Sequence, residues 1–155
     1  MQHALPHLPM VADLLKACYW FEDALRKNQE AHGIPTVTRA QAFLLANIGN
    51  GEHRAARLAR TLGISRQAIS KMLSELIEQG VLETVPDPDD ARAQLVVFTA
   101  QHLPTQLATI SILFQLEKEL EQKFGKKKLE VIRSVMAEDW GPLPLLESVA
   151  LDQPS

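Results

Sequence analysis

A run of cationic side chains at residues 53–74, HRAARLARTLGISRQAISKMLS, is the part of the sequence best suited to binding chemistry. The run contains five Lys or Arg residues and no Asp or Glu. Because the whole chain carries a formal charge of −3 and this run carries +5, the remainder carries −8. A local cationic cluster on an acidic chain is typical of a surface that neutralises phosphates. The cationic residues are Arg54, Arg57, Arg60, Arg66 and Lys71.

The elements expected to position these cations are two short helices joined by a sharp turn. In the first helix, apolar residues recur with the i, i+3, i+4, i+7 spacing of a helix buried on one face. Gly63 follows, where the chain must leave the helix through a left-handed conformation. Ser65 is a good N-cap for the second helix, which ends at Gly80. The spacing predicts a helix-turn-helix, whose second helix can lie in the DNA major groove. The apolar residues of the first helix are Ala55, Leu58, Ala59 and Leu62.

The second helix should present a polar face opposite an apolar stripe. Arg bonds guanine, Gln bonds adenine, Ser bonds either base, and Lys bonds phosphate or guanine, mostly from the first turn of such a helix. The alternative is the solvated face of an ordinary amphipathic helix. The predicted buried stripe is Ile69, Met72, Leu73, Leu76 and Ile77. The candidate DNA contacts are Arg54, Arg57, Ser65, Arg66, Gln67, Ser70, Lys71, Ser74 and, in the next segment, Arg92.

The segment after Gly80 predicts a β-hairpin, or wing. Residues 81–85 and 94–99 are rich in β-branched and apolar side chains, and residues 86–93 contain strong turn formers. Arg92 is the only basic residue in this loop, and a single Arg at a hairpin tip suits the narrow minor groove. Asp90 is expected to orient the Arg92 guanidinium by a bidentate pair, and the alternative is an ordinary surface ion pair.

With these motifs, residues 38–99 resemble the MarR family of bacterial transcription regulators. The resemblance covers a helix at 39–47, the helix-turn-helix, and the wing, where Asp90-Ala91-Arg92 matches the family's Asp-x-Arg pair. It implies that the recognition helix reads the major groove, that the wing contacts the minor groove, and that the protein is a homodimer. One departure is His53, which stands where the family usually has a Ser or Thr N-cap.

Long helical stripes on both sides of this region predict the partner surface. We expect helices over 10–31, 104–124 and 126–139, and the first carries the stripe Val11, Leu14, Leu15, Cys18 and Leu25. A monomer of this size would struggle to bury apolar faces at both ends of the chain. We therefore expect a single domain over 1–155, in which residues 8–33 and 104–151 form a helical dimerisation region around a winged helix-turn-helix DNA-binding lobe at 36–100.

Composition agrees with a fold that is mostly α with a small β-hairpin wing. Aromatic residues make up only 5% of the chain, and long helical periodicities dominate. No apolar run approaches 18 residues, so no transmembrane helix is expected. The first residues lack the blocks of a signal peptide, and one cysteine excludes an intramolecular disulfide, so a cytoplasmic location is the default expectation.

Other chemistry is less well supported by the residue patterns. Cys18 is a candidate peroxide-sensing thiol by resemblance, and the alternative is a small buried apolar residue. His3 and His7 have the i, i+4 spacing of metal ligands, but Pro6 between them disfavours a helix, so no metal site and no cofactor are expected. The sequence contains no catalytic triad, HExxH or phosphate-loop pattern, so an enzyme is not expected.

A small-molecule effector is implied by the resemblance, with Trp20, His32 and Phe43 as candidate ligand-binding residues. The alternative for each of them is plain core or interface. A second reading of the whole chain is a dimeric ligand-sensing or protein-interaction module whose helix-turn-helix no longer reads DNA. The overall acidity favours that reading, and the cationic run at 53–74 argues against it.

Overall fold

The structure, a computed structural model, describes residues 9–145. The predicted histidine pair at residues 3 and 7 and the ends of the predicted dimerisation region therefore lie outside the described residues. The chain divides into two compact units at the Glu117–Lys118 boundary, and each is considered separately. The elements are α1 (Met10–Ala31), α2 (Arg39–Gly49), α3 (Ala55–Leu62), α4 (Arg66–Glu78), β1 (Leu82–Asp87), β2 (Asp90–Phe98), η1 (Ala100–His102), α5 (Leu103–Phe124) and α6 (Lys126–Ala137).

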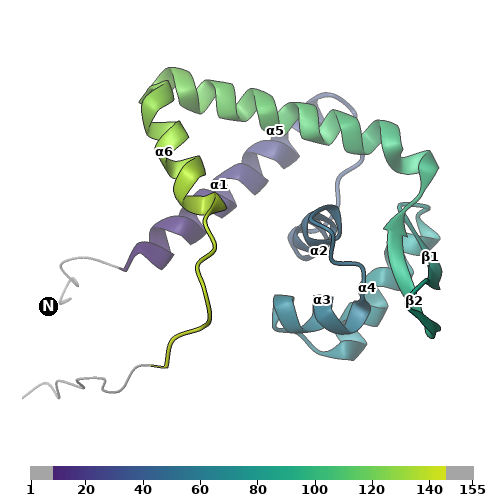
Figure 1. The fold of residues 1–155 in the computed structure, drawn as a ribbon. Coiled ribbons are helices and arrows are strands. Elements are labelled where there is room, and N and C mark those ends of the chain that lie inside the picture. The colour runs from purple at the N-terminus through teal and green to yellow at the C-terminus, as the bar shows by residue number, and fades with distance from the viewer. Residues whose placement is uncertain (1–8, 146–155) are drawn as a thin grey trace, which may run out of the picture. The chain divides into compact units, whose positions relative to one another are not determined.

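Helices α2, α3 and α4 and the hairpin gather into one lobe (Figure 1). Its core takes side chains from each of these elements, so the lobe has a continuous apolar centre. This arrangement confirms the predicted fold class, mostly α with a winged helix-turn-helix. The buried core residues are Leu44, Ile48, Leu58, Ala59, Ile69, Leu73, Leu76, Val81, Leu82 and Val96.

The boundaries of the helix-turn-helix follow from local capping. Gly63 has φ 65° and ψ 30°, the left-handed conformation that the sequence predicted at the end of α3. Ser65 accepts a hydrogen bond from the Ala68 N–H at 3.1 Å and so caps α4. The predicted stripe of α4 was wrong at one end, because Ile77 is 38% exposed while Leu76 is fully buried.

Helix α2 begins with a reciprocal cap. The Thr38 side chain accepts from the Gln41 N–H, and the Gln41 side chain accepts from the Thr38 N–H at 3.0 Å. The Gln41 amide also donates to Glu75 Oε2 at 3.1 Å, which joins the start of α2 to α4. Both ends of this buried side chain are therefore satisfied, and α2 is fixed against α4.

The strands of the wing are longer, and its loop is shorter, than the sequence predicted. β1 and β2 pair antiparallel, with a register irregularity between Pro86 and Asp87. Only Pro88 and Asp89 form the turn, so the predicted loop at 86–93 was wrong. Arg92 consequently lies on β2, two residues beyond the first residue of that strand.

Helix α1 has the predicted bounds but not the expected burial. Its buried residues are polar, Glu22 and Gln29, and the Gln29 amide donates to Thr109 Oγ1 of α5 at 3.1 Å. The predicted apolar stripe is largely uncovered, with Val11 59% and Leu15 49% exposed. Cys18 is also exposed, so in the single chain the prediction of a small buried apolar residue was wrong.

The unit that begins at Lys118 contains the end of α5 and helix α6. Gly125, with φ 91°, separates the two helices in a conformation that favours glycine. No described residue of α6 is buried, and Val131, Ile132, Val135 and Met136 are each 45% to 57% exposed. Within residues 9–145, no helix is long and apolar enough to span a bilayer.

Candidate nucleic-acid interface

The outward face of α4 carries the side chains that the sequence predicted to read DNA. Helix α4 buries Ile69, Leu73 and Leu76 in the lobe, and this fixes which face points to solvent. All five predicted contacts on α4 are exposed, so the structure brings them together on one helix surface. They are Arg66, Gln67, Ser70, Lys71 and Ser74. Ser65 also belongs to this end of α4, but its hydroxyl already accepts the Ala68 N–H.

The cationic run is partly neutralised by acids that are distant in sequence or lie just outside it. Arg57 Nη1 lies 3.9 Å from Glu52 Oε2, and Lys71 Nζ lies 4.0 Å from Glu75 Oε1. Arg57 and Lys71 are well exposed and both separations are long, so these pairs contribute little and can open. The sequence pattern of cations without acids therefore overstated the positive charge of the folded surface.

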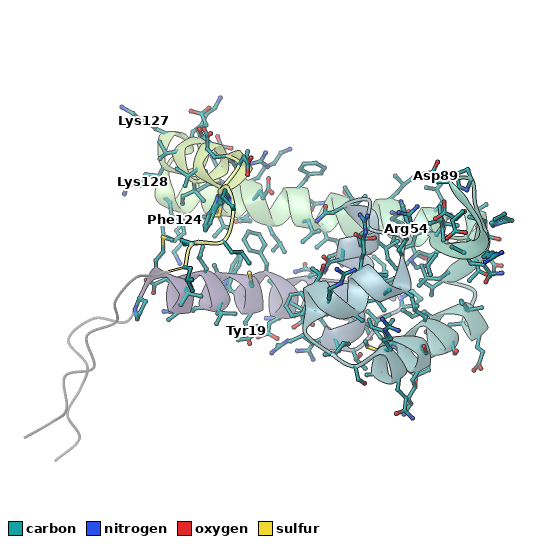
Figure 2. The ribbon with its side chains drawn as sticks, turned by 60° about the horizontal axis from the view of Figure 1, so that its bottom comes forward. Tyr19, Arg54, Asp89, Phe124, Lys127 and Lys128 are labelled. Carbon is teal, nitrogen blue, oxygen red and sulfur yellow. The ribbon has the colours of Figure 1, made fainter. Side chains whose placement is uncertain are left out.

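Arg54 is held much more firmly than the other cations. Its Nε and Nη2 atoms lie 2.9 Å and 2.7 Å from Asp87 Oδ2, and Nη2 lies 3.8 Å from Asp89 Oδ2. The Asp87 carboxylate is buried, with only 1% of its side chain exposed. Figure 2 shows Arg54 and Asp89 close together at the wing. The structure thus gives Arg54 a partner in the hairpin, a role that the sequence did not predict.

The environment of Asp87 favours its charged form. The Asp89 backbone N–H and then the Arg54 guanidinium donate hydrogen bonds that hold the pKa of Asp87 below its usual range. The same contact raises the pKa of Arg54, since its hydrogen bond to Asp87 favours the guanidinium. Both groups are therefore ionised at neutral pH.

Three cations of the lobe keep their charge unpaired. Within residues 9–145, Arg60, Arg66 and Arg92 form no ion pair, and all three are exposed. The predicted bidentate pair between Asp90 and the Arg92 guanidinium is not formed. Asp90 Oδ1 instead accepts the backbone N–H of Arg92 at 3.0 Å, because the short turn places that N–H within reach. These three arginines are the side chains most available to phosphates.

The segment before α3 is joined to the wing through His53. Its carbonyl accepts the Val96 N–H at 2.9 Å, and its Nδ1 lies 3.0 Å from the Val96 carbonyl oxygen. A carbonyl only accepts, so the proton of the imidazole is assigned to Nδ1. Arg54 at the N-cap position makes no side-chain cap, and Glu52 accepts its N–H at 3.1 Å. The N-cap of α3 is therefore Arg54 and not His53, and His53 pairs with β2 instead.

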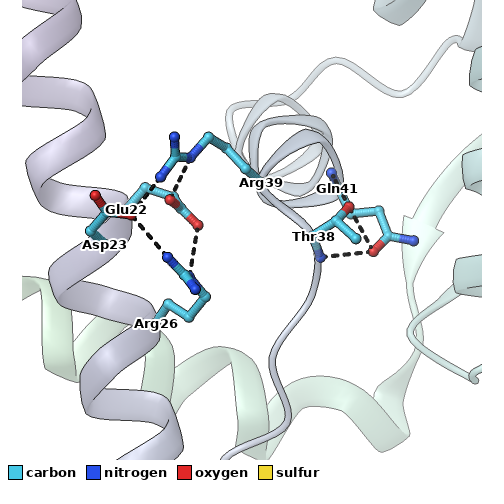
Figure 3. A network of polar contacts seen from close by, with 6 residues as sticks. All are labelled: Glu22, Asp23, Arg26, Thr38, Arg39 and Gln41. Atoms are coloured by element: carbon cyan, nitrogen blue, oxygen red, sulfur yellow. Dashed lines mark hydrogen bonds and ion pairs between the residues drawn. The ribbon is translucent and has the colours of Figure 1, made fainter.

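A polar network ties α1 to the start of α2. Arg39 Nε donates to Glu22 Oε2 at 2.6 Å, and Arg39 Nη2 donates to Asp23 Oδ1 (Figure 3). Arg26 donates to Asp23 Oδ1 at 3.0 Å and lies 3.7 Å from Glu22 Oε1. The Arg39 guanidinium also lies 4.9 Å from the centroid of the Tyr19 ring. These contacts satisfy Glu22, the buried carboxylate of α1.

The candidate effector residues lie on α1, just beyond the end of α1, and on α2. Trp20 is 45% exposed on α1 and packs edge to face on Phe21. His32 is exposed beyond the end of α1, where its Nδ1 lies 2.8 Å from the Asn28 carbonyl oxygen. Phe43 is half-buried in α2. Their role in ligand binding remains a prediction. Within residues 9–145, no group of His, Cys, Asp and Glu side chains is arranged to hold a metal ion.

A shallow hollow of about 600 Å³ lies where α5 meets α6. It is lined by apolar side chains and by the stems of Lys127 and Lys128, which Figure 2 labels beside Phe124. The first turn of α6 contains no acid to complement the helix dipole, and Lys126 pairs with Glu130 at 3.8 Å. The remaining lining residues are Gly125, Val131 and Ile132.

Comparisons with known proteins agree with this geometry. Residues 36–93, which contain the helix-turn-helix and most of the wing, match the model of the MarR family. No curated protein matches the sequence significantly. Among solved structures, the transcriptional regulator Tm0710 from Thermotoga maritima is 25% identical, with a TM-score of 0.55 over 83% of this chain and 89% of that chain.

Two further solved structures share the fold at lower identity. Wild-type MarR from E. coli in its apo form is 20% identical, with a TM-score of 0.64 over 84% of this chain and 96% of that chain. NadR in complex with 4-hydroxyphenylacetate is 17% identical, with a TM-score of 0.66 over 88% of this chain and 96% of that chain. The likeness extends well beyond the winged lobe, so the long helices belong to the shared architecture.

Proposed function

We propose that this chain, a member of the MarR family, is a transcriptional regulator that binds double-stranded DNA sequence-specifically as a homodimer on a palindromic operator. One observation carries the proposal. The α4 face opposite the lobe's core presents Arg66 and Gln67 to solvent, and the exposed Arg60 and Arg92 of the same lobe have no ionic partner within residues 9–145. Such side chains supply both base-edge contacts and phosphate neutralisation.

The roles of the candidate residues follow from their positions. Arg66, Gln67 and Ser70, in the first turns of α4, would contact base edges in the major groove. Arg60, Lys71 and Ser74 would contact phosphates or flanking bases, and Arg92 would enter the minor groove. One helix reads few base pairs, so two copies related by a two-fold axis would read half-sites roughly 10 bp apart.

The proposal of a homodimer is supported by apolar faces that the chain does not cover. Helices α1, α5 and α6 each expose several large apolar side chains, and such surface is unfavourable in water. A two-fold dimer is the commonest way to bury a self-complementary surface. Light scattering at micromolar concentration should give twice the chain mass, and a monomeric mass would contradict this part of the proposal. The exposed residues include Val11, Leu15, Trp20, Leu107, Ile110, Phe114, Ile132 and Val135.

We further propose that a small molecule releases the dimer from DNA, and that binding represses transcription. NadR, which shares the fold, was solved with 4-hydroxyphenylacetate, and this supports an effector without identifying the one used here. Trp20, His32 and Phe43 remain the candidate ligand contacts. Because the proposed target is genomic DNA, we propose a cytoplasmic location.

The test is selection from a random library of double-stranded DNA with the purified protein. An inverted repeat among the retained sequences is the expected result. Repeating the selection with Arg66→Ala or Gln67→Ala should relax the preference at a few positions of each half-site, while Lys16→Ala on α1 should retain the wild-type motif. Retention without any motif would contradict sequence-specific reading. Absence of retention at low salt would instead favour a protein-interaction or ligand-sensing module.

A further inference from the structure

We propose that Arg54 and Asp87 are a positioning pair, which fixes the wing on the helix-turn-helix so that Arg92 reaches the minor groove. Arg54 would then act on DNA binding through Asp87 and not through a phosphate contact of its own. The inference rests on the function proposed above. It assigns to Arg54 a role different from that of the other cations at residues 53–74.

The geometry of the pair attaches Arg54 to the hairpin. Two nitrogens of Arg54 approach a single oxygen of Asp87, at 2.9 Å and 2.7 Å, so the guanidinium is directed at the hairpin. The other oxygen, Oδ1, accepts the Asp89 N–H at 2.9 Å and thereby caps the Pro88–Asp89 turn. One carboxylate thus fixes both the start of α3 and the turn of the wing.

The burial of Asp87 makes its charge dependent on Arg54. The Asp87 side chain is 1% exposed, and a carboxylate withdrawn from water is stable as an anion only while its hydrogen bonds and its cation are present. Removing Arg54 would leave that charge without its cation, so the hairpin would be expected to rearrange until water reaches Asp87. The exposed pairs of Arg57 and Lys71 carry no such constraint, since water replaces their partners at little cost.

His53, the residue before Arg54, pairs with β2. The His53 carbonyl and imidazole both contact the Val96 backbone, so the segment before α3 is attached to β2. Arg54, the next residue, is attached to β1 through Asp87. Both strands of the wing are therefore bound to the same short segment. Arg92, on β2 between the turn and Val96, takes its position from these two attachments.

The two roles of Arg54 predict opposite effects for Asp87→Asn. That change removes a negative charge near the DNA, so simple electrostatics predicts equal or tighter binding. A positioning role predicts weaker binding, by about tenfold for each lost arginine contact and so by about a hundredfold for the proposed dimer. The double variant Arg54→Met/Asp87→Asn should bind no more weakly than either single variant, because both changes break the same pair.

A second cycle tests whether the pair acts through the wing. Arg54→Met should weaken binding of the proposed dimer about a hundredfold in the wild-type background and hardly at all in the Arg92→Ala background. Arg54→Lys keeps the charge but cannot present two nitrogens in a fixed fork, so it should resemble Arg54→Met. Arg57→Met, in the first turn of α3 three residues after Arg54, is the matched control and should be additive with Arg92→Ala.

A measurement without DNA keeps the proposal testable if a variant folds poorly. In the native chain, the Asp89 N–H should exchange slowly with solvent because it is bonded to Asp87. Arg54→Lys should accelerate this exchange while the amide of Ile69, in the core of α4, exchanges as in the wild type. Equal exchange at Asp89 in both proteins would overturn the positioning role.

The DNA measurements separate the two proposals. Wild-type protein that binds no DNA would overturn the proposed function, and the wing role with it. Wild-type protein that binds DNA, together with unchanged or tighter binding by Asp87→Asn, would overturn only the positioning pair. Additive losses for Arg54→Met and Arg92→Ala would also overturn it, because they would identify Arg54 as an independent DNA contact.

Discussion

Replacing Arg60 by Gln should make DNA binding less sensitive to salt by an amount that the structure allows to be calculated. Arg60 is exposed on α3 and forms no ion pair within residues 9–145, so its expected contribution to binding is the neutralisation of a phosphate. Each neutralised phosphate contributes about −0.9 to the slope of log affinity against log salt. A dimer loses two such contacts, so the slope should become less negative by about 2.

The wild-type slope follows from the same count. Within residues 9–145, Arg60, Arg66 and Arg92 are unpaired, and each brings one uncompensated positive charge to the duplex; counting each as one released counterion gives a slope of about −5 for the proposed dimer. Between 50 mM and 200 mM salt, affinity should therefore fall about 10³-fold for the wild type and about 10²-fold for Arg60→Gln. Opening of the exposed Arg57 and Lys71 pairs on binding would steepen both slopes equally and leave their difference unchanged.

The assay is fluorescence anisotropy with a labelled duplex that carries the selected inverted repeat, titrated at five or more KCl concentrations. Lys16→Gln is the matched control, because Lys16 is an exposed cation on α1, outside the winged lobe. Its slope should equal that of the wild type. An unchanged slope for Arg60→Gln, or an equal change for Lys16→Gln, would refute the assignment of phosphate contacts to the lobe.

Three further predictions concern stability. Gly63→Ala should lower the free energy of unfolding by about 1–2 kcal/mol because of the positive φ, whereas Gly49→Ala, at an ordinary φ with open space around it, should cost nothing in thermal denaturation. The lowered pKa of Asp87 contributes stability that is present above its unfolded pKa of about 3.8 and is lost as pH falls through the folded value. Asp87→Asn should therefore reduce the fall in the free energy of unfolding, measured with urea, as the pH is lowered. Burial lowers the pKa of His102, so the stability that depends on its neutral form should be full above about pH 6.5 and decline below it. His102→Gln should remove this decline, whereas the control His32→Gln, at an exposed position, should leave it in place.

The helix-turn-helix could be predicted closely because its boundaries depend on local chemistry. Gly63 is needed for a left-handed residue and Ser65 for a cap, and both signals lie within a few residues of the structure they determine. The polar face of α4 followed from the same periodicity. Because these features are determined by short segments, the sequence alone is enough to predict them.

The ion pairs could not be predicted in this way because they join distant segments. Asp87 lies 33 residues from Arg54, and Glu22 lies 17 residues from Arg39, so no local pattern relates them. The extent of β2 was also missed, since strand pairing and not turn propensity placed Arg92 on a strand. In both cases, tertiary contacts decided the outcome.

The apolar stripe of α1 illustrates a different limit of local patterns. The periodicity correctly predicted a helix at Met10–Ala31, but it did not indicate what covers the stripe. Val11, Leu15 and Cys18 remain exposed in a single chain, whereas the polar Glu22 and Gln29 are buried. An exposed stripe of this kind is what a dimer interface requires, and it supports the proposal of a second copy.

The most direct test of the account compares two affinities of the wild-type protein at 0.15 M salt. One duplex carries the selected inverted repeat, and the other has the same composition in scrambled order. We predict that the repeat binds at least about 10³-fold more tightly, as specific regulators do. Equal affinities for the two duplexes would contradict the central claim that the exposed face of α4 reads DNA sequence.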